Sequence, residues 1–333
     1  ALSVLDLVPI REGGTLSQAY EDAAALAACA EQAGYKRYWV AEHHAMEGVG
    51  GGATSVVLAH IGHATRTIRI GAGGIMLPNH APLVVAEAFG TLAELYPGRI
   101  DLGLGRAPGT DRITMRALRR DRVETEEDFP NDVQELQHLL GEPQPGQPII
   151  AMPGAGTQVP IWLLGSSLYS AQLAAQLGLP FAFASHFAPR MLMQAVQIYR
   201  QTFRPSQQLA APYVAIGVPL VAAPSDEEAT YLASSTHQRV LGILTGRRGQ
   251  LPPPVENFLS SLDSGAQAAI ADFLAAAVIG GPDTVRAGLQ QLAALTQANE
   301  LVLVSDVYDA ESRRRSLDIA AAAARELNAA VAQ

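Results

Sequence analysis

The sequence predicts an α/β protein folded as a (β/α)8 TIM barrel. Short apolar runs alternate with longer amphipathic runs along the chain, which is typical of strands that are each followed by a helix. Eight such units can be counted within 333 residues, a length that suits one barrel or two ordinary domains. A doubly wound sheet is the alternative, but no GxGxxG motif follows the first strand.

Each short apolar run is interpreted as a strand and each longer amphipathic run as a helix, in chain order. The predicted strands are Leu2–Ile10, Arg37–Ala41, Ile68–Ile75, Arg99–Leu104, Pro160–Leu164, Phe181–Ala184, Ala215–Ala222 and Glu300–Ser305. The predicted helices are Ser17–Gly34, Ser55–Thr65, Pro82–Leu95, Glu124–Leu140, Ser170–Leu177, Pro189–Phe203, Pro282–Thr296 and Ala310–Ala330. Strands that alternate with helices form a parallel sheet, and eight such units favour a closed barrel.

Two segments interrupt this pattern within what we interpret as a single domain over residues 1–333. Gly141–Val159 is rich in Pro and Gly and is predicted to be a loop or a small hairpin. Residues 225–281 form an insertion between strand 7 and helix 7, and its stretch Thr245–Pro254 cannot be regular structure. Because active sites of barrels lie among the βα loops, the insertion could be a lid; a structural decoration or an oligomer contact explains it equally well.

Composition excludes several classes of protein. The net charge of −9 argues against a general binder of nucleic acid or of anionic membranes. Lys36 is the only lysine, so there is no P-loop GK pair, and Cys29 is the only cysteine, so no disulfide can form within the chain. No apolar stretch reaches about 18 residues and no secretory signal is evident, so we expect a cytoplasmic protein.

Polar residues gather where the predicted strands end. Glu42, His43 and His44 follow the second strand, and histidine at that position can act as acid, base or hydrogen-bond donor near neutral pH. Glu42 could also join a histidine in binding a metal ion. Adjacent side chains on a strand point to opposite faces, however, so His43 and His44 cannot easily share one ion, and we expect no metal site.

Small residues and one arginine follow the next strands. Gly73 and Gly74 end the third strand and suggest either a flat ring packed on the backbone or a tight turn. Arg106 follows the fourth strand and is suited to bind a phosphate, or to pair with a carboxylate of the protein. Gly165-Ser166-Ser167 follows the fifth strand and opens a helix that contains Tyr169; such a turn binds anions, or simply caps the helix. Because strands four and five are neighbours, both segments can grip one phosphate.

Together these residues resemble the bacterial luciferase-like family of flavin-dependent monooxygenases. The matching pieces are AEHH at Ala41–His44, GAGGIMLPNHAPLVVAEAFGTLAELYPGRIDLGLGRAPGTD at Gly71–Asp111, PIWLLGSS at Pro160–Ser167, AAQLGLPFAFASHF at Ala174–Phe187 and ELVLVSD at Glu300–Asp306. The resemblance implies a TIM barrel that binds reduced FMN or, in some branches, the deazaflavin F420. The segments LPNHAPLVVAEAFG and GLGRAPGTD are more similar to the FMN branch of the family.

Carried over by position, the resemblance implies a cis peptide between Gly73 and Gly74 beneath the flavin ring, and the phosphate-binding arginine at Arg106. It also implies that Gly165 and Ser166 form the phosphate-binding turn, near Tyr169, and that His43 is the catalytic histidine. One departure matters, because Gly105 stands where luciferase itself has a cysteine. Efficient light emission is therefore not expected.

The function expected from this resemblance is a monooxygenase that uses reduced FMN and O2 on a small organic substrate. A separate flavin reductase would supply the reduced FMN, because the chain has no nicotinamide-binding fingerprint, and a homodimer is expected. The alternatives are F420-dependent hydride transfer, a metal-dependent barrel hydrolase that uses Glu42 and His43, and a flavin-binding protein without catalytic activity.

Overall fold

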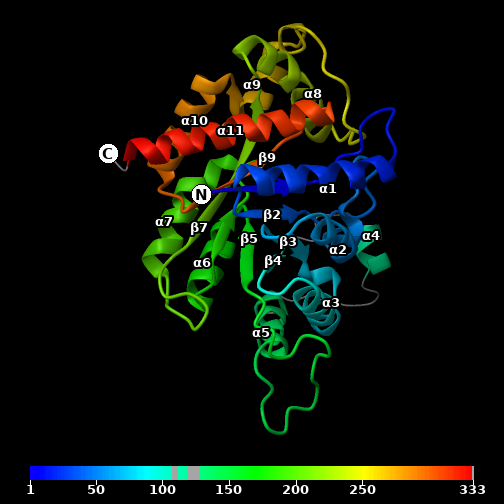
Figure 1. The fold of residues 1–333 in the computed structure, drawn as a ribbon, viewed down its shortest axis with the longest axis vertical. Coiled ribbons are helices and arrows are strands. Elements are labelled where there is room, and N and C mark those ends of the chain that lie inside the picture. Colours follow the sequence, from blue (N-terminus) through cyan, green and yellow to red (C-terminus); the bar gives the residue numbers. More distant parts are fainter. Residues whose placement is uncertain (107–111, 119–127, 332–333) are drawn as a thin grey trace.

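Eight parallel strands close into a barrel in the computed structural model, which describes residues 1–106, 112–118 and 128–331 (Figure 1). The barrel strands are β1 (Leu2–Asp6), β2 (Arg37–Val40), β3 (Arg69–Met76), β4 (Ile100–Gly105), β5 (Ile161–Gly165), β6 (Phe181–Phe183), β7 (Val214–Ala222) and β9 (Glu300–Val304). They pair in the order β6-β5-β4-β3-β2-β1-β9-β7, and pairing of β6 with β7 closes the ring. The predicted TIM barrel is confirmed.

Helices surround the barrel and connect successive strands. They are α1 (Leu16–Ala33), α2 (Thr54–Ala64), α3 (Pro82–Leu95), α4 (Arg112–Leu118), α5 (Asp128–Leu140), α6 (Leu168–Leu177), α7 (Leu192–Thr202), α8 (Asp226–Leu244), α9 (Ser264–Phe273), α10 (Pro282–Thr296) and α11 (Ala310–Val331), with short 3-10 turns η1 (Gly51–Ala53), η2 (Leu77–Asn79), η3 (Pro189–Met191) and η4 (Leu259–Ser261). The first and last of the long helices, α1 and α11, lie side by side across the barrel (Figure 1).

A few of the predicted elements differ from those in the structure. The first strand ends at Asp6 rather than Ile10, because the Asp6 carboxylate accepts the Val8 N–H and Val8 has a φ of 50°. Residues 141–159 contain no strand, so this segment is a loop and not a hairpin. The start of the helix predicted from Glu124 lies outside the described residues, and its described part is α5.

The insertion is more regular than expected, because α8 and α9 form most of it. A short strand, β8 (Val278–Gly280), pairs with the end of β7 beyond the barrel ladder. The stretch Thr245–Pro254 is irregular, as predicted, apart from one bridge between Leu251 and Arg11. Its backbone is tied to the loop after β1, since Leu251 N–H donates to the Ile10 carbonyl at 2.8 Å and Glu12 N–H donates to the Leu251 carbonyl at 2.9 Å.

Alternation along the strands separates two apolar layers. Ile216 and Val218 of β7 belong to the large core between the sheet and the helices. Ala215 of the same strand belongs to a second cluster, made from alternate residues of six different barrel strands: Leu5, Trp39, Ala41, Trp162, Ala182, Ala215, Val302 and Val304. Since side chains along a strand alternate between faces, this second cluster fills the inside of the barrel.

The amino-terminal end of the barrel interior is closed by buried charges. Arg37 of β2 donates to Glu300 of β9 and to Asp101 of β4, each at 2.6 Å. Arg69 of β3 also pairs with Asp101 at 2.6 Å, and the Tyr213 hydroxyl donates to Glu300 at 2.8 Å. These groups satisfy one another across the barrel, so this end is a polar plug and the opposite end holds the open site.

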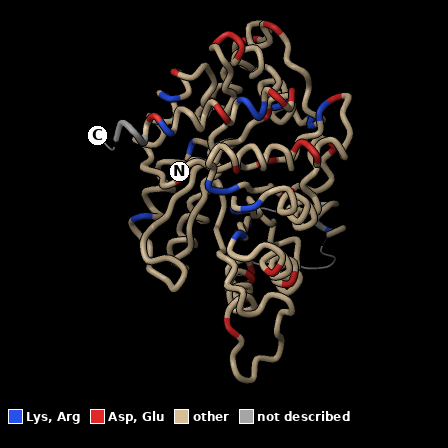
Figure 2. Tube along the Cα trace, viewed as in Figure 1, with Lys and Arg blue, Asp and Glu red and all other residues tan. Residues whose placement is uncertain are grey.

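Charged residues of both signs are interspersed over the molecule in the view of Figure 2. None of the helices within the described ranges is long and apolar enough to cross a membrane.

Candidate active site

The carboxyl ends of the barrel strands bring the predicted site segments to one face. Glu42-His43-His44 follow β2, Arg106 follows β4, and Ser166 and Ser167 follow β5. All neighbouring strands of the barrel pair in parallel, so these segments lie at the same end.

Gly73 and Gly74 form a backbone surface at this end. Their peptide bond is cis, as the resemblance implies. The pair lies within β3 and not in a turn after it, and the register between β3 and β4 shifts between Ala72 and Ile75. A Cβ at Gly74 would lie 2.6 Å from the carbonyl carbon of Gly103, so no side chain fits there. The tight-turn interpretation is therefore wrong.

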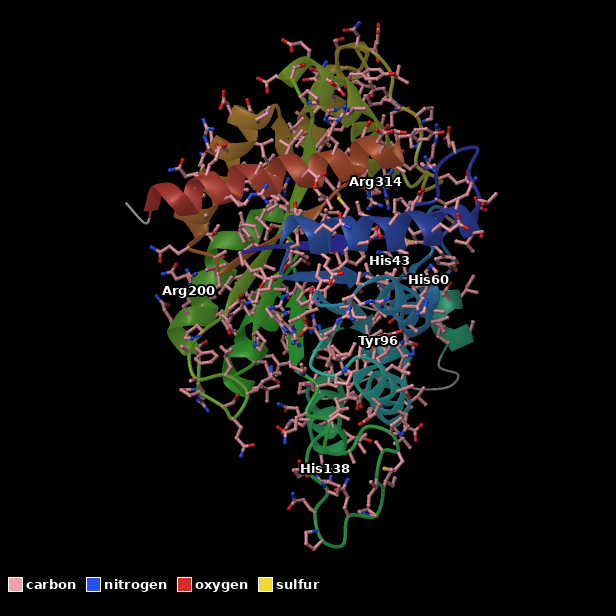
Figure 3. All side chains as sticks on the ribbon, viewed as in Figure 1. His43, His60, Tyr96, His138, Arg200 and Arg314 are labelled. Atoms are coloured by element: carbon pink, nitrogen blue, oxygen red, sulfur yellow. The ribbon has the colours of Figure 1, made fainter. Side chains whose placement is uncertain are left out.

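His43 continues the inward alternation of Trp39 and Ala41 and projects toward the barrel interior. Its Nδ1 atom is buried and has no hydrogen-bond partner among the described residues. Burial, together with the positive charge of Arg239, lowers the pKa of His43 to about 4. His43 is therefore neutral at physiological pH. Figure 3 labels His43 just below α1 in this view, with His60 of α2 nearby.

Glu42 points away from the interior and anchors a second cluster. Its carboxylate accepts hydrogen bonds from His44, from His80 at 2.6 Å and from the Met76 N–H at 3.0 Å. Burial acts to raise the pKa of Glu42, but these hydrogen bonds outweigh it and lower the pKa. The prediction that His43 and His44 face opposite sides is confirmed, and His80 is a neighbour of Glu42 that the sequence analysis missed.

The ligand atoms of Glu42, His44 and His80 lie within 4.8 Å of one another, which is close enough for a metal ion. Hydrogen bonds already account for this cluster, because the carboxylate has two imidazole partners and one amide partner. These hydrogen bonds link the end of β2 to η2. They therefore fix the position of the two segments that carry His43 and the Gly73–Gly74 pair.

A second corner of the face combines Arg106 with the start of α6. The Arg106 guanidinium is exposed and lies 4.1 Å from the centroid of the Tyr169 ring. Neither Asp101 nor Glu42 neutralises it, because Asp101 is paired with Arg37 and Glu42 with two histidines.

Ser167 occupies the N-cap position of α6, yet its side chain makes no capping hydrogen bond. The structure therefore brings Arg106, Ser166, Ser167 and Tyr169 together, and the amides that open α6 are not capped by a side chain. This is the arrangement of an anion site at a helix N-terminus.

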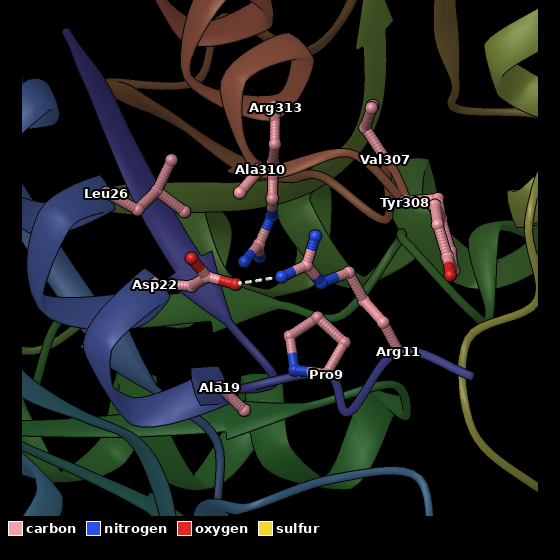
Figure 4. A pocket seen from close by; sticks show the side chains of 9 residues that line it. All are labelled: Pro9, Arg11, Ala19, Asp22, Leu26, Val307, Tyr308, Ala310 and Arg313. Atoms are coloured by element: carbon pink, nitrogen blue, oxygen red, sulfur yellow. Dashed lines mark hydrogen bonds and ion pairs between the residues drawn. The ribbon is translucent and has the colours of Figure 1, made fainter. Parts of the chain in front are cut away.

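Two pockets differ greatly in size. The one in Figure 4 lies near the start of α1, around the ion pair of Arg11 and Asp22, and holds about 10 Å³, room for roughly one water molecule. The larger holds about 520 Å³, a size typical of sites for small organic molecules. It is lined by Ser166, Phe187, Ala188, Pro189, Arg190, Met191, Leu244, Ala269, Asp272 and Phe273. Its walls are mainly apolar, and the insertion supplies one side.

The insertion also approaches His43. Arg239 of α8 pairs with Asp306, which follows β9, at 2.8 Å. The charges of Arg239 and Arg248 both act on His43. A Cβ at Gly48 would lie 1.9 Å from the Gly249 carbonyl oxygen, so the loop after β2 packs directly against the insertion.

Acid should destabilise the protein through two histidines at this face. Burial lowers the pKa values of His43 and His186 from 6.5 to about 4. The unfolded chain binds more protons between these pH values, so stability is full above pH 6.5 and falls as the pH drops to about 4, by roughly 3 kcal/mol per histidine. Chemical denaturation of the wild type, H43N and H186N at several pH values measures this. An equally steep acid loss in all three proteins would contradict it.

The fold and site together define a TIM-barrel protein. At one end of the barrel it carries the Gly73–Gly74 backbone surface, the neutral His43, and an anion site formed by Arg106 and the start of α6. The family model for luciferase-like monooxygenases matches residues 2–298. The chain belongs to the luciferase-like monooxygenase family.

Three similar proteins illustrate this membership. A luciferase-like monooxygenase of Escherichia coli K12 is 47% identical over 327 residues, which cover 98% of each chain. Bacillus subtilis YvbT is 48% identical over 322 residues, covering 96% of this chain and 95% of that one. The crystal structure of apo-MsnO8 is 35% identical, covers 97% of this chain and 98% of its own, and superposes with a TM-score of 0.87.

Proposed function

We propose that this protein is a flavin-dependent monooxygenase that uses reduced FMN and O2 to oxidise a small organic substrate. The observation that carries the proposal is that the Gly73–Gly74 backbone surface, neutral His43 and Arg106 beside the start of α6 lie at the same end of the barrel. Among the described residues, a side chain at Gly105 would approach only the Ile75 carbonyl oxygen, at 3.9 Å. These residues fit an FMN molecule.

Each part of the face has a role in this proposal. Arg106 and the turn Gly165-Ser166-Ser167 bind the phosphate, Tyr169 supports the guanidinium, and Gly73–Gly74 support the flat ring. Bound reduced FMN supplies two electrons, so that one atom of O2 enters the substrate and the other leaves as water. His43 holds or moves a proton at the reacting oxygen, and Glu42 positions the segment that carries His43.

FMN is favoured over F420. Similar folds carry both cofactors: an oxygenase component of 3,6-diketocamphane monooxygenase from Pseudomonas putida is complexed with FMN, and a secondary alcohol dehydrogenase uses F420. The long acidic tail of F420 calls for a basic channel. The larger pocket next to Ser166 is mainly apolar, and its Arg190 is already paired with Asp272 at 2.5 Å. This supports FMN at the corner and an apolar substrate beyond it.

Several partners complete the proposal. A separate reductase supplies reduced FMN, and the insertion at residues 225–281 acts as the lid that keeps water from the site. The protein works in the cytoplasm as a homodimer. One relative, N-acetyl-S-alkylcysteine monooxygenase of Bacillus subtilis, is 39% identical over 187 residues, or 55% of this chain. N-acetyl-S-butylcysteine is therefore a sensible first substrate probe, and decanal, a long-chain carbonyl compound, is a second one that suits the mainly apolar pocket.

Oxygen labelling tests the proposed reaction. The protein is mixed with chemically reduced FMN, one of the two probes and ¹⁸O2, and the products are analysed by mass spectrometry. The proposal expects one ¹⁸O atom in the product of an accepted probe and the second in water. Labelled hydrogen peroxide with both probes rejects them as substrates, and product made without O2 would instead favour hydride transfer.

Replacing Arg106 by alanine should weaken binding of reduced FMN by about 1.5–3 kcal/mol, the scale of a hydrogen bond to a charged group. The measurement is an anaerobic fluorescence titration. Arg204→Ala is the matched control, because Arg204 is exposed in the loop between α7 and β7, at the opposite end of the barrel. Equal affinity of R106A and wild type would remove Arg106 from the phosphate site.

A further inference from the structure

A second half-buried imidazole, with a buried Nδ1 atom, lies after the strand opposite the one that His43 follows. His186 follows β6, and His43 follows β2. In the closed ring β2 and β6 are four strands apart in either direction, so the two residues sit on opposite sides of the barrel mouth.

The ring of His186 lies over the inner face of β7. A Cβ at Gly217 would be 2.3 Å from His186 Nδ1, so only glycine leaves room for the imidazole there. Gly217 alternates with Ile216 and Val218, which point outward into the helix layer, and it follows Ala215 of the interior cluster. His186 therefore occupies interior space at the carboxyl end of the barrel, and its other neighbour is Phe187, with ring centroids 4.9 Å apart.

The two imidazoles share their electrostatic environment. Burial, together with the charge of protonated His43, lowers the pKa of His186 to about 4. Around His43 the charged groups are Arg239, Arg248 and Glu42, and Arg239 is paired with Asp306. Both rings are thus neutral at physiological pH, each with one N–H and one lone pair.

His186 also lacks the partner that a structural role would require. Its Nδ1 atom, like that of His43, is buried without a hydrogen bond to any part of the chain that the structure describes. Buried polar atoms are nearly always paired, because an unpaired one loses its hydration without compensation. The Ser235 and Ser305 hydroxyls are also buried without a partner in the described ranges, but the two imidazoles project into the barrel interior at its carboxyl end, which indicates a partner that arrives with the reaction.

We propose that His186 is a second catalytic residue, which hydrogen-bonds the reacting oxygen from the side opposite His43. The inference rests on the proposed function. If reduced FMN is bound here without a substrate, it would supply two electrons and two protons to O2, which would leave as hydrogen peroxide. Negative charge develops on oxygen as the electrons arrive, so a neutral N–H donor in the site lowers the barrier. Two donors on opposite sides can bind both oxygen atoms.

The test compares H186N and H186L with the wild type in full-length protein. The Asn amide can reach the position of Nδ1, whereas Leu fills a similar volume without a polar atom. His63→Asn is the matched control, since His63 is exposed on α2. For each protein, reduced FMN is titrated without oxygen, and its re-oxidation is then followed by stopped flow between about pH 5.5 and pH 8.5.

We expect all four proteins to bind reduced FMN within about threefold of one another, and H186L to be re-oxidised at least about tenfold more slowly. H186N should recover most of the rate, and H63N should match the wild type. Normal binding with wild-type re-oxidation in H186L would overturn this inference alone. If the wild type fails to bind reduced FMN, the proposed function fails, and the inference with it.

Histidine NMR provides a readout without cofactor. In H43N the like charge beside His186 is absent, so the pKa of His186 should move upward from about 4. A pKa of His186 that is the same in H43N and wild type would overturn the pairing of the two rings.

Discussion

Leucine in place of His43 is expected to slow product formation by about 10²- to 10⁴-fold, the range that a positioned acid–base group contributes. The reason is the state of the His43 imidazole, which is neutral and has a buried Nδ1 atom without a hydrogen-bond partner in the described part of the chain. A protonated histidine would be a poor proton acceptor, and one that is already hydrogen-bonded would be unable to reach the oxygen. The loss should fall on the reaction itself and not on binding of reduced FMN.

His138→Asn is a suitable control for this experiment, because His138 lies exposed on α5. The comparison uses the rate of ¹⁸O incorporation together with the affinity for reduced FMN. If H43L keeps wild-type turnover, His43 has no role in the chemistry. If H43L loses FMN binding to the same degree as turnover, its role is in binding only.

Replacing Arg37 by methionine is expected to lower the free energy of unfolding by about 3–5 kcal/mol, the usual effect of removing one partner from a buried ion pair. Arg37 is 4% exposed and lies between Glu300 and Asp101, with its guanidinium 4.6 Å from the centroid of the Trp162 ring. Methionine has a similar length but leaves Glu300 as a buried carboxylate without its closest cation.

Urea denaturation of R37M and wild type measures this effect. Arg190→Met is the matched control, because Arg190 pairs with Asp272 on the surface, and such pairs contribute about 0–1 kcal/mol. The double variant R37M/E300Q should be less unstable than the sum of its single variants, since each removes the same interaction. A loss below about 1 kcal/mol in R37M would contradict the view that these charges close the barrel.

The barrel was predictable because its strands are continuous apolar runs, and all eight were found within a few residues of their ends. The helices α8 and α9 inside the insertion were not predicted, although the sequence contains signals for both. Ser225 accepts a hydrogen bond from the Glu228 N–H at the start of α8, and Asp263 does the same for Ala266 at the start of α9. Both are N-cap residues of a type that favours helix starts. The prolines between the two helices favour irregular structure, and they led to a prediction without helices in this segment.

The site residues were likewise predictable only where a local sequence signal marks them. His43 and Arg106 were recognisable because they directly follow strands, and the structure places them at one end of the barrel. His80 and His186 also follow strands, after β3 and β6, yet they were not singled out. Their significance depends on contacts with a neighbouring strand, with Glu42 after β2 for His80 and with Gly217 of β7 for His186. These partners are far apart in the sequence, so the contacts cannot be derived from spacing along one chain.

The central claim is that this face binds reduced FMN, and an anaerobic titration of the full-length protein tests it most directly. Reduced FMN is added without oxygen while its fluorescence is recorded, and F420 is titrated in a parallel experiment. The account predicts saturable binding of one reduced FMN per chain, with little binding of F420. Saturation by F420 without binding of FMN in either redox state would contradict it.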